Sequence, residues 1–226
     1  MYRYETHLHT APVSKCAQAD VRENLEFYKS KGYDGVFITN HFLDGNINGD
    51  RTRPYIDQLD FYFTDYEEAL SLADEIGIKV FLGIEITYGG TDFLIYGLPK
   101  EWYYAHPEIM QMSKTDELRF MMDEGALVIQ AHPFREAGYI DHIRLFPRCV
   151  HGVEIINAQH GPFENDMAAH YAKTYDLIEF AGSDNHRAGR NENAYYAGMQ
   201  SNVPIQNELD FITRVKNREL SVFSSD

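Results

Sequence analysis

The sequence has little cysteine and no long apolar run. Its 226 residues include only two cysteines, Cys16 and Cys149, so a disulfide framework is excluded and a reducing compartment is expected. No apolar stretch reaches the length of a transmembrane helix, and no secretory hydrophobic segment precedes the first predicted strand. We therefore expect a cytoplasmic protein with no membrane partner.

Positive charge is also scarce. Lysine and arginine number 20 against 35 aspartate and glutamate residues, which gives a net charge of −15. Such a chain is repelled by long nucleic acids, although a local basic pocket can still hold one phosphate group. With 44% hydrophobic and 24% charged residues, the composition is that of an ordinary globular protein. The length suits one domain over residues 1–226.

Histidine, by contrast, is plentiful, with ten residues, and one pair lies near the N-terminus. Residues 3–9 have the alternation of a β-strand, so His7 and His9 point to the same face. Two converging imidazoles are a common device for binding a transition metal. Taken alone, a surface pair or one core histidine would be the preferred interpretation. The pattern gains weight from further histidines and acids at regular places along the chain.

Strand and helix patterns alternate along the rest of the sequence. Strands are predicted at residues 3–9, 35–39, 79–85, 92–97, 126–131, 150–156 and 177–181, with a short last one at 220–223. Helices are predicted at 20–31, 64–76, 113–124, 164–175 and 206–217, and Thr64 with Glu67 resembles a capping box. Residues 42–63 predict a long, lid-like loop. These repeated units predict an α/β fold with a parallel sheet, open or closed into a barrel.

Candidate metal ligands stand where the predicted strands end. In a parallel barrel, functional side chains gather at that edge. A core or surface position would explain any one candidate, but it does not explain the placement of the whole set. We predict a metal centre formed by His7, His9, His41, Glu85, His132, Asp184 and His186.

Five short motifs carry a resemblance to a known family. In order and strand placement they are similar to the motif series of the PHP (polymerase and histidinol phosphatase) superfamily. The motifs are His7-x-His9, Thr39-Asn40-His41, Gly83-x-Glu85, Ala131-His132-Pro133 and Gly182-Ser183-Asp184-x-His186. The resemblance spans nearly the whole chain. It implies a distorted (β/α)7 TIM-like barrel of the PHP type, with two or three divalent metal ions that hydrolyse phosphoesters.

The donor set agrees with this implication. Imidazoles mixed with carboxylates suit Zn, Mn or Fe ions. A water held between two metals is a hydroxide near neutral pH, so no protein nucleophile is needed, and His186 is the candidate acid or base. Glu85 is expected to bridge two metals. The first would be enclosed by His7, His9, Glu85 and Asp184, the second held by Glu85 and His132, and a third by His41 and His186.

The chain departs from the family pattern at three places. Many members have Asp where this chain has Asn40, and an amide cannot act as a base. Members with three metals usually carry another histidine after His-x-His, where this chain has Cys16, either a thiolate ligand or a buried inert thiol. A histidine often found after the fourth strand is also missing. Asp92 and His106 are the available substitutes, although the default role of Asp92 is that of a loop or capping acid.

Cationic residues near the strand ends are candidates for binding the substrate phosphate. Arg135 is the best of them, because a guanidinium fork matches phosphate oxygens. Asn157 is expected to contact the substrate or to support a ligand. Further cationic candidates are Lys15, Arg51, Arg53, Arg187 and Arg190, with solvated surface charge as the alternative for each. Surface positions are predicted for His106, His142, His151, His160 and His170.

These observations predict a metal-dependent hydrolase of phosphoester bonds, most simply a phosphomonoesterase that acts on a small phosphorylated metabolite. A nuclease or nucleotide phosphatase for short substrates is the alternative among enzymes. From another class, a noncatalytic metal-binding regulatory barrel is suggested by Asn40 and by the missing third-site histidine. Metal analysis and turnover of a generic aryl phosphate separate these hypotheses.

Overall fold

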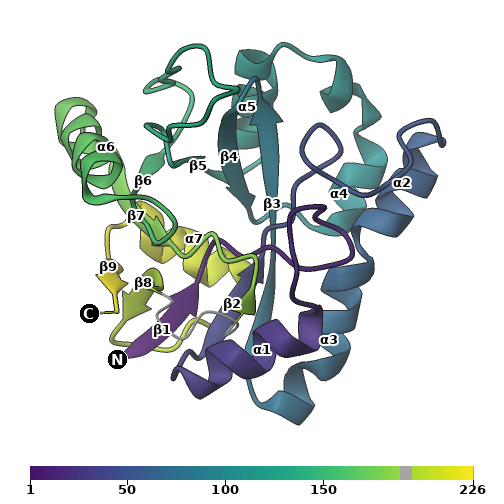
Figure 1. Ribbon diagram of the computed structural model, residues 1–226, viewed down its shortest axis with the longest axis horizontal. Coiled ribbons are helices and arrows are strands. Elements are labelled where there is room, and N and C mark those ends of the chain that lie inside the picture. The colour runs from purple at the N-terminus through teal and green to yellow at the C-terminus, as the bar shows by residue number, and fades with distance from the viewer. Residues whose placement is uncertain (189–194, 226) are drawn as a thin grey trace.

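The computed structural model describes residues 1–188 and 195–225, and its centre is one nine-stranded sheet curled into a nearly closed barrel (Figure 1). The sheet order is β7-β6-β5-β4-β3-β2-β1-β8-β9. The strands are β1 (Tyr2–Glu5), β2 (Gly35–Ile38), β3 (Lys79–Tyr88), β4 (Thr91–Tyr96), β5 (Leu127–Ala131), β6 (Gly152–Asn157), β7 (Ile178–Gly182), β8 (Ala197–Ser201) and β9 (Ser221–Ser224). The barrel expected from the sequence is therefore confirmed, although its strands are not all parallel.

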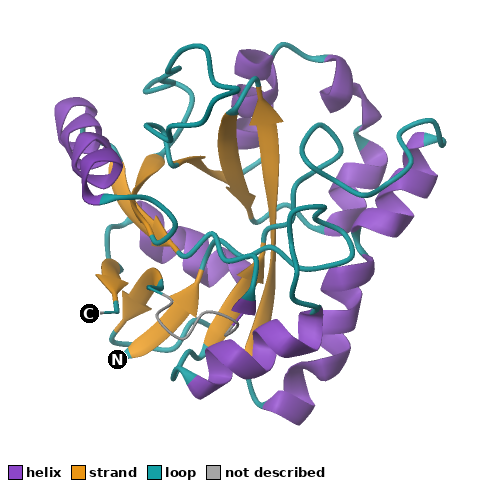
Figure 2. Ribbon diagram, viewed as in Figure 1, coloured by secondary structure: helices purple, strands orange, loops and turns teal. Residues whose placement is uncertain are grey.

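Helices cover the outside of the sheet and one end of the barrel (Figure 2). They are α1 (Val21–Ser30), α2 (Tyr55–Tyr62), α3 (Thr64–Ile76), α4 (Lys100–Ala105), α5 (Lys114–Asp123), α6 (Pro162–Tyr175) and α7 (Glu208–Lys216), with a 3₁₀ helix at Pro107–Gln111. Asp20 and Glu23 form a capping box at the start of α1. In the described part of the chain, no helix is long and apolar enough to cross a membrane.

The sheet closes where the chain continues beyond β1 and β7. Leu8 forms a parallel bridge with Asn185, and the His9 N–H donates to the Asn185 carbonyl at 3.1 Å. Ser183, just beyond β7, exchanges two hydrogen bonds with the backbone of Ala197, the first residue of β8. The segments that bear His-x-His and Asp184 are therefore joined side by side.

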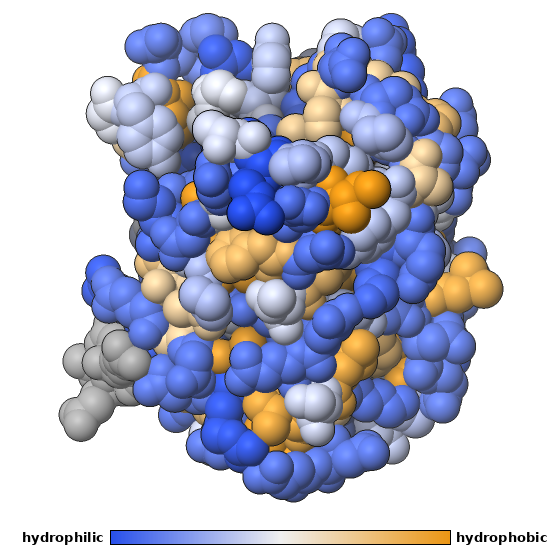
Figure 3. Space-filling model, turned by 90° about the vertical axis from the view of Figure 1, so that its right-hand side faces the viewer, coloured by the Kyte–Doolittle hydropathy of each residue, from blue (hydrophilic) through white to orange (hydrophobic). Residues whose placement is uncertain are grey.

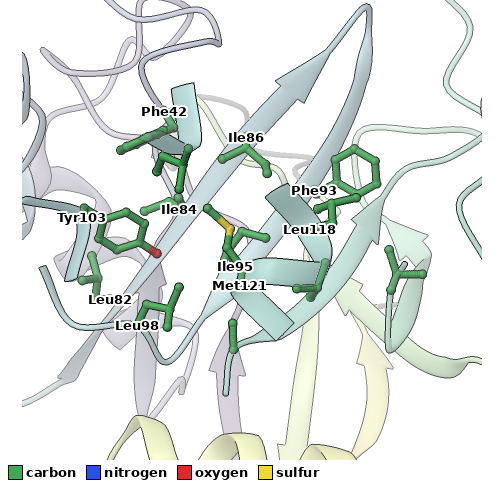
Figure 4. Close-up of a cluster of buried hydrophobic side chains, with 14 of the residues drawn as sticks. Phe42, Leu82, Ile84, Ile86, Phe93, Ile95, Leu98, Tyr103, Leu118 and Met121 are labelled. Atoms are coloured by element: carbon green, nitrogen blue, oxygen red, sulfur yellow. The ribbon is translucent and has the colours of Figure 1, made fainter. Parts of the chain in front are cut away.

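Side-chain alternation in β3 decides which residues face the barrel interior. Leu82, Ile84 and Ile86 belong to the apolar cluster between the sheet and its covering helices (Figure 4). Glu85 stands between Ile84 and Ile86 and therefore points the opposite way, into the barrel. The same parity places Phe81 on the inner side of the strand.

The end of the barrel away from Glu85 is filled with apolar side chains. Phe37 stacks on Phe81 and meets Tyr96 edge to face, and α7 adds Phe211 and Ile212 to the same cluster. Because this end is packed, polar groups that must meet at the barrel axis are confined to the other end.

The sheet is mixed, so the prediction of parallel strands is wrong for part of it. β4 pairs antiparallel with β3 and with β5, and β8, which was not predicted, pairs antiparallel with β1 and β9. Gly89 and Gly90 make the β3–β4 turn with φ of 57° and 85°, values that glycine adopts without strain. Since β4 runs against its neighbours, its first residues lie at the edge where β3 and β5 end. Asp92 is brought to that edge.

Two local predictions are wrong. The loop expected over residues 42–63 contains α2, whose Leu59 and Tyr62 are buried in the apolar cluster next to β3. Thr64 does not cap α3. It is already the first helical residue, its hydroxyl donates to the Phe61 carbonyl, and Phe63 occupies the capping position. The two helices follow each other too closely for a separate cap.

The face viewed in Figure 3, on the side of α2, α3 and α4, is mainly hydrophilic, with apolar side chains in small separate patches. Exposed apolar residues on these elements include Ile56 and Leu70. Scattered apolar side chains of this kind are normal on a folded surface.

Gly97, just after β4, provides a test of how tightly α7 closes the barrel. It has a φ of 91°, and a Cβ at this position would overlap Cδ1 of Ile212 on α7. We expect Gly97→Ala to lower the free energy of unfolding by about 2–4 kcal/mol, through backbone strain and overpacking together. Urea denaturation measures this loss.

Gly125→Ala is the matched control, because Gly125 has a φ of 99° but no atom within 4 Å of the added Cβ. It reports the backbone strain alone. Equal losses in the two variants would show that packing against Ile212 does not limit stability.

Candidate metal centre

The structure brings the seven predicted ligands together at the open end of the barrel. They come from the segments after β1, β2, β5 and β7 and from within β3. His7 and His9 are fully buried, and His41, the most exposed of the others apart from His186, is 9% exposed. A polar cluster this deeply buried requires compensation for the charges that it contains.

Glu85 lies at the middle of the cluster. Its Oε1 is 3.2 Å from Nε2 of His7 and 3.5 Å from Nε2 of His132. Its Oε2 is 3.4 Å from Nε2 of His9 and 2.6 Å from Nδ1 of His41. Each carboxylate oxygen thus faces its own pair of imidazoles, an arrangement suited to a bridging ligand.

Asp184 faces Glu85 across the same imidazoles. Its Oδ1 is 3.5 Å from Nε2 of His7 and 3.3 Å from Nε2 of His9, while its Oδ2 is 3.6 Å from Nε2 of His132. Three groups of candidate ligand atoms result, with members within 4.8 Å of one another: His7, His9 and Asp184; His7, Glu85 and His132; His9, His41 and His186.

A divalent cation fits this arrangement. Nδ1 of His41, Oε2 of Glu85 and Nε2 of His132 are buried, and none has a hydrogen-bond partner among the described residues. The His41 and Glu85 atoms lie 2.6 Å apart but not in hydrogen-bonding geometry. Buried polar atoms are normally satisfied, and imidazoles with carboxylates are ligands for transition metals.

Hydrogen bonds at the far side of three of the imidazoles decide which nitrogen faces the centre. Nδ1 of His7 donates to Oε1 of Glu154 at 2.8 Å, so Nε2 is the nitrogen directed at Glu85 and Asp184. Nδ1 of His186 donates to the Asp184 carbonyl at 2.7 Å. These tautomers are assigned from the hydrogen-bond network.

Ser14 fixes the ring of His9 in the same way. Its hydroxyl donates to Oδ1 of Asn40 at 2.8 Å, so its oxygen accepts from the His41 N–H and from Nδ1 of His9, both at 3.1 Å. His9 therefore presents Nε2 to the centre.

Asn40 anchors this loop rather than contributing a base. Its Oδ1 also accepts from the Thr10 N–H, and its Nδ2 donates to Thr10 Oγ1 and to Oδ2 of Asp65 at 3.2 Å. Asp65 is buried, and burial raises the pKa of its carboxyl. A second carboxylate at position 40 would repel Asp65, which explains why an amide fits here.

Glu154 is the residue of this centre that sequence reasoning missed. It is buried on β6, and besides holding His7 its Oε2 accepts from the His132 N–H at 3.1 Å and from Nδ2 of Asn157 at 3.0 Å. One carboxylate thus orients two candidate ligands. An acid in the middle of an otherwise apolar strand was the available signal, because a buried charge needs a partner.

Asn157 has its hydrogen-bonding groups engaged within the protein. Its Nδ2 donates to Glu154 and, at 3.2 Å, to Oδ2 of Asp184, while its Oδ1 accepts from the Gln159 N–H. Of the two roles expected for Asn157, these contacts favour support of a ligand over contact with the substrate.

Charge and burial act in opposite directions on the carboxylates. Burial disfavours the charged forms of Glu85 and Asp184, but the surrounding imidazoles outweigh it and hold the pKa of both carboxyls well below the usual range. Burial likewise opposes protonation of His7, yet Asp184, Glu154 and Glu85 raise its pKa well above the usual value.

The pKa values of His9 and Cys16 are both lowered. Burial, reinforced by His41 and His186, lowers the pKa of His9 to about 3, so its imidazole is neutral and able to donate a lone pair. Burial would raise the pKa of Cys16, but hydrogen bonds with His186 and His41 outweigh it and lower that pKa to about 6. Cys16 therefore lies near His41 and His186, but outside the three groups of candidate ligand atoms.

Two candidate ligands occupy left-handed backbone. His132 has a φ of 21° and Asp184 a φ of 50°. Residues other than glycine rarely adopt these values, and each such residue costs about 1–3 kcal/mol. The backbone is thus strained at two points where a side chain is aimed into the centre.

Asp92 and Arg135 form an ion pair at the edge of the centre. Nη2 of Arg135 is 2.8 Å from Oδ2 of Asp92 and donates to the Gly90 carbonyl, and the same Asp92 oxygen is 3.8 Å from Nε2 of His132. Asp92 is therefore close to the ligands but outside the three groups. Nε of Arg135 is buried and has no partner among the described residues.

The other cationic candidates lie farther out. Lys15 and Arg187 are exposed, next in sequence to Cys16 and His186. Arg51 donates to the Gly45 carbonyl and Arg53 pairs with Asp57. Arg190 lies outside the described residues.

Three of the histidines expected at the surface, His106, His151 and His160, are instead partly buried. His160 packs edge-on against His132, with ring centroids 5.3 Å apart, and burial lowers its pKa to about 4. Nδ1 of His151 accepts from the Val128 N–H at 3.1 Å, and burial lowers its pKa to about 4. His106, named above as an available substitute for a missing ligand, pairs with Glu108 and belongs to none of the three ligand groups.

Comparison with solved structures gives matches over most of the chain, whereas no family model and no curated protein matches it. A two-domain protein of Bacteroides vulgatus, containing a predicted PHP-like metal-dependent phosphoesterase, superposes with a TM-score of 0.66 at 15% identity, covering 98% of this chain and 64% of that one. This chain has a PHP-like fold.

Two other solved structures illustrate the range of similarity. PsfC from Pseudomonas syringae gives a TM-score of 0.59 at 16% identity, covering 94% of this chain and 89% of its own. The lesion-specific endonuclease EndoQ from Pyrococcus furiosus gives 0.53 at 11% identity, covering 98% and 57%. This chain spans less than two thirds of the length of the Bacteroides vulgatus protein and of EndoQ.

Replacing Glu154 tests its role in holding the ligands. Glu154→Gln removes the charge that orients His7 and accepts from the His132 N–H, so we expect metal affinity to fall by about 10- to 100-fold. Competition against a chelating dye measures this affinity. Glu179→Gln on β7, which removes an exposed carboxylate, is the control. Equal affinities for the two variants would mean that Glu154 has no influence on the centre.

Proposed function

We propose that the protein is a metal-dependent phosphoesterase that hydrolyses the phosphate monoester of a small metabolite. The observation that carries this proposal is the convergence of five histidines and two acids, with buried ligand atoms that lack a partner in the described residues. Two fold neighbours support it, one containing a predicted metal-dependent phosphoesterase and the other being an endonuclease. The two free cysteines favour a cytosolic location.

The three ligand groups would hold two or three divalent cations, with Zn, Mn or Fe favoured by the donor set. When bound, such cations would activate a water molecule and neutralise phosphoryl oxygens. The chain itself orients the ligands, through Glu154 at His7, Ser14 at His9 and backbone at His186. The apolar side chains packed at the far end of the barrel exclude water from the metal centre on that side.

Arg135 is the residue we propose for binding the phosphate. Its ion pair with Asp92 fixes the guanidinium beside His132, and its buried Nε remains available as a donor. A planar guanidinium held in this way matches two phosphate oxygens. Where the third group holds no cation, His186, partly exposed beside Cys16, is the proposed group for proton transfer to the leaving oxygen.

A nuclease or nucleotide phosphatase that acts on short substrates is the second candidate. The endonuclease among the fold neighbours favours it. The net charge of −15 disfavours long polynucleotides, so a mononucleotide or dinucleotide would be the substrate. Comparing p-nitrophenyl phosphate with bis-p-nitrophenyl phosphate separates monoester from diester hydrolysis. Metal binding without turnover of either would indicate a noncatalytic regulatory barrel.

Variants of the ligands and of Arg135 are expected to behave differently. His132→Ala and Asp184→Ala should abolish turnover and reduce metal content together. Arg135→Ala should raise KM for a phosphomonoester by about 10- to 100-fold with metal content intact, since it removes a charge-assisted hydrogen bond to the substrate. Steady-state kinetics and elemental analysis of the same preparations measure both.

Arg144→Ala is the matched control, because that guanidinium lies in the same loop and binds the Gly89 carbonyl. Loss of metal in Arg135→Ala, or unchanged KM and kcat, would refute the assignment of Arg135.

We propose that Cys16 is a ligand of the third metal, so that variants at this position change the number of metals bound. Cys16 lies against His41 and His186, where related chains supply a histidine, so we expect Cys16→Ser to bind one metal fewer and Cys16→His to restore the count. Cys149→Ser, which removes the second free thiol, a buried one, should leave the stoichiometry unchanged. Elemental analysis gives the count. An unaltered count in Cys16→Ser would exclude Cys16 as a ligand.

A further inference from the structure

A hollow lies beside the metal centre, between the loop that follows β6 and the first turns of α6. Its volume is about 550 Å³, within the range of small-molecule sites. Its wall includes Ile155, Ile156, Ala158, His160, Ala169 and Tyr195. Because β6 ends at the edge where the ligands gather, the hollow opens on the same side of the barrel as the centre.

His160 connects the hollow to the centre. Its ring contacts the ring of His132, and its Nε2 is buried without a hydrogen-bond partner among the described residues. The His160 N–H donates to the Asn157 carbonyl at 3.1 Å, and Asn157 in turn holds Asp184. The inner end of the hollow is thus fixed to two candidate ligands.

The wall itself is mainly hydrocarbon. Ile155, Ile156, Ala158 and Ala169 contribute aliphatic surface and Tyr195 an aromatic ring, whereas the amide of Asn165 is engaged with the backbone of Asn157. Nε2 of His160 is buried and has no hydrogen-bond partner among the described residues, and the exposed carboxylate of Asp166 also lines the hollow. A mainly apolar wall binds an organic moiety, and a carboxylate in that wall disfavours a second anion.

We propose that this hollow receives the organic group of the phosphoester, and that this group is aromatic or otherwise bulky and apolar, with one hydrogen-bonding atom that meets His160. The proposal rests on the phosphoesterase function. A phosphate between Arg135 and the ligands next to His132 would direct its ester oxygen toward His160. The enzyme would then distinguish one phosphomonoester from another by burial of the leaving group, because the contacts to the phosphate are common to all monoesters.

Non-hydrolysable phosphonates test the proposal without relying on turnover. Calorimetric titration of the metal-loaded protein with 1-naphthylphosphonate and with ethylphosphonate should show at least about tenfold tighter binding of the naphthyl compound. Ala169→Phe and Ala158→Leu fill the hollow from the helix and from the loop. Each should remove this preference and leave the affinity for ethylphosphonate unchanged.

Met167→Phe is the control, because it adds a ring to the same helix at a position outside the hollow. Circular dichroism checks that each variant folds, and either filling variant is sufficient on its own. Equal affinities of the wild type for the two phosphonates would overturn the proposal. A naphthyl preference that survives filling of the hollow would also overturn it.

The corresponding esters, 1-naphthyl phosphate and ethyl phosphate, separate this proposal from the proposed function. If the naphthyl preference behaves as expected but neither ester is hydrolysed, the phosphoesterase function fails and the assignment of the hollow stands. If both esters are hydrolysed with kcat/KM ratios that filling the hollow does not change, the function stands and the assignment of the hollow is wrong.

Discussion

Electrostatic balance around two buried carboxylates is the constraint on which this centre depends. Glu85 and Asp184 are almost inaccessible to solvent, and an ionised carboxylate in that position needs opposite charge or takes up a proton. Imidazoles from separate segments of the chain supply part of that charge, and a divalent cation would supply the rest. The barrel closure between the extensions of β1 and β7 holds these groups at ion-pairing distance.

Much of this arrangement can be predicted from local sequence pattern. The predicted strand over residues 79–85 ends in Glu85, which is enough to name it as a ligand, whereas the inward direction of its side chain is known only from the fold. The apolar spacing of Val21, Leu25 and Tyr28 predicts α1. The ligands could be named from the sequence because each follows or ends a predicted strand, although β3 continues past Glu85 to Tyr88. Their joint placement in space is what the fold adds.

The remaining features depend on contacts between residues distant in sequence. The antiparallel direction of β4 is decided by the glycine turn at residues 89–90, and that direction brings Asp92 to Arg135. In the sequence, Glu154 is one acid in an apolar strand. Only the fold shows that it contacts His7, which is 147 positions away. In the sequence, Asn40 stands as a missing catalytic base, because its hydrogen bond to Asp65 is known only from the fold. Propensity and periodicity contain no information about such partners.

The left-handed backbone at His132 and Asp184 has an evolutionary consequence. Glycine at either position, or asparagine at the second, adopts such dihedral angles more easily, so replacement would relieve strain while deleting a ligand. A lineage with no use for the cation would gain stability from these exchanges and would drift toward them. Histidine and aspartate at these two positions are therefore the costlier residues for the backbone.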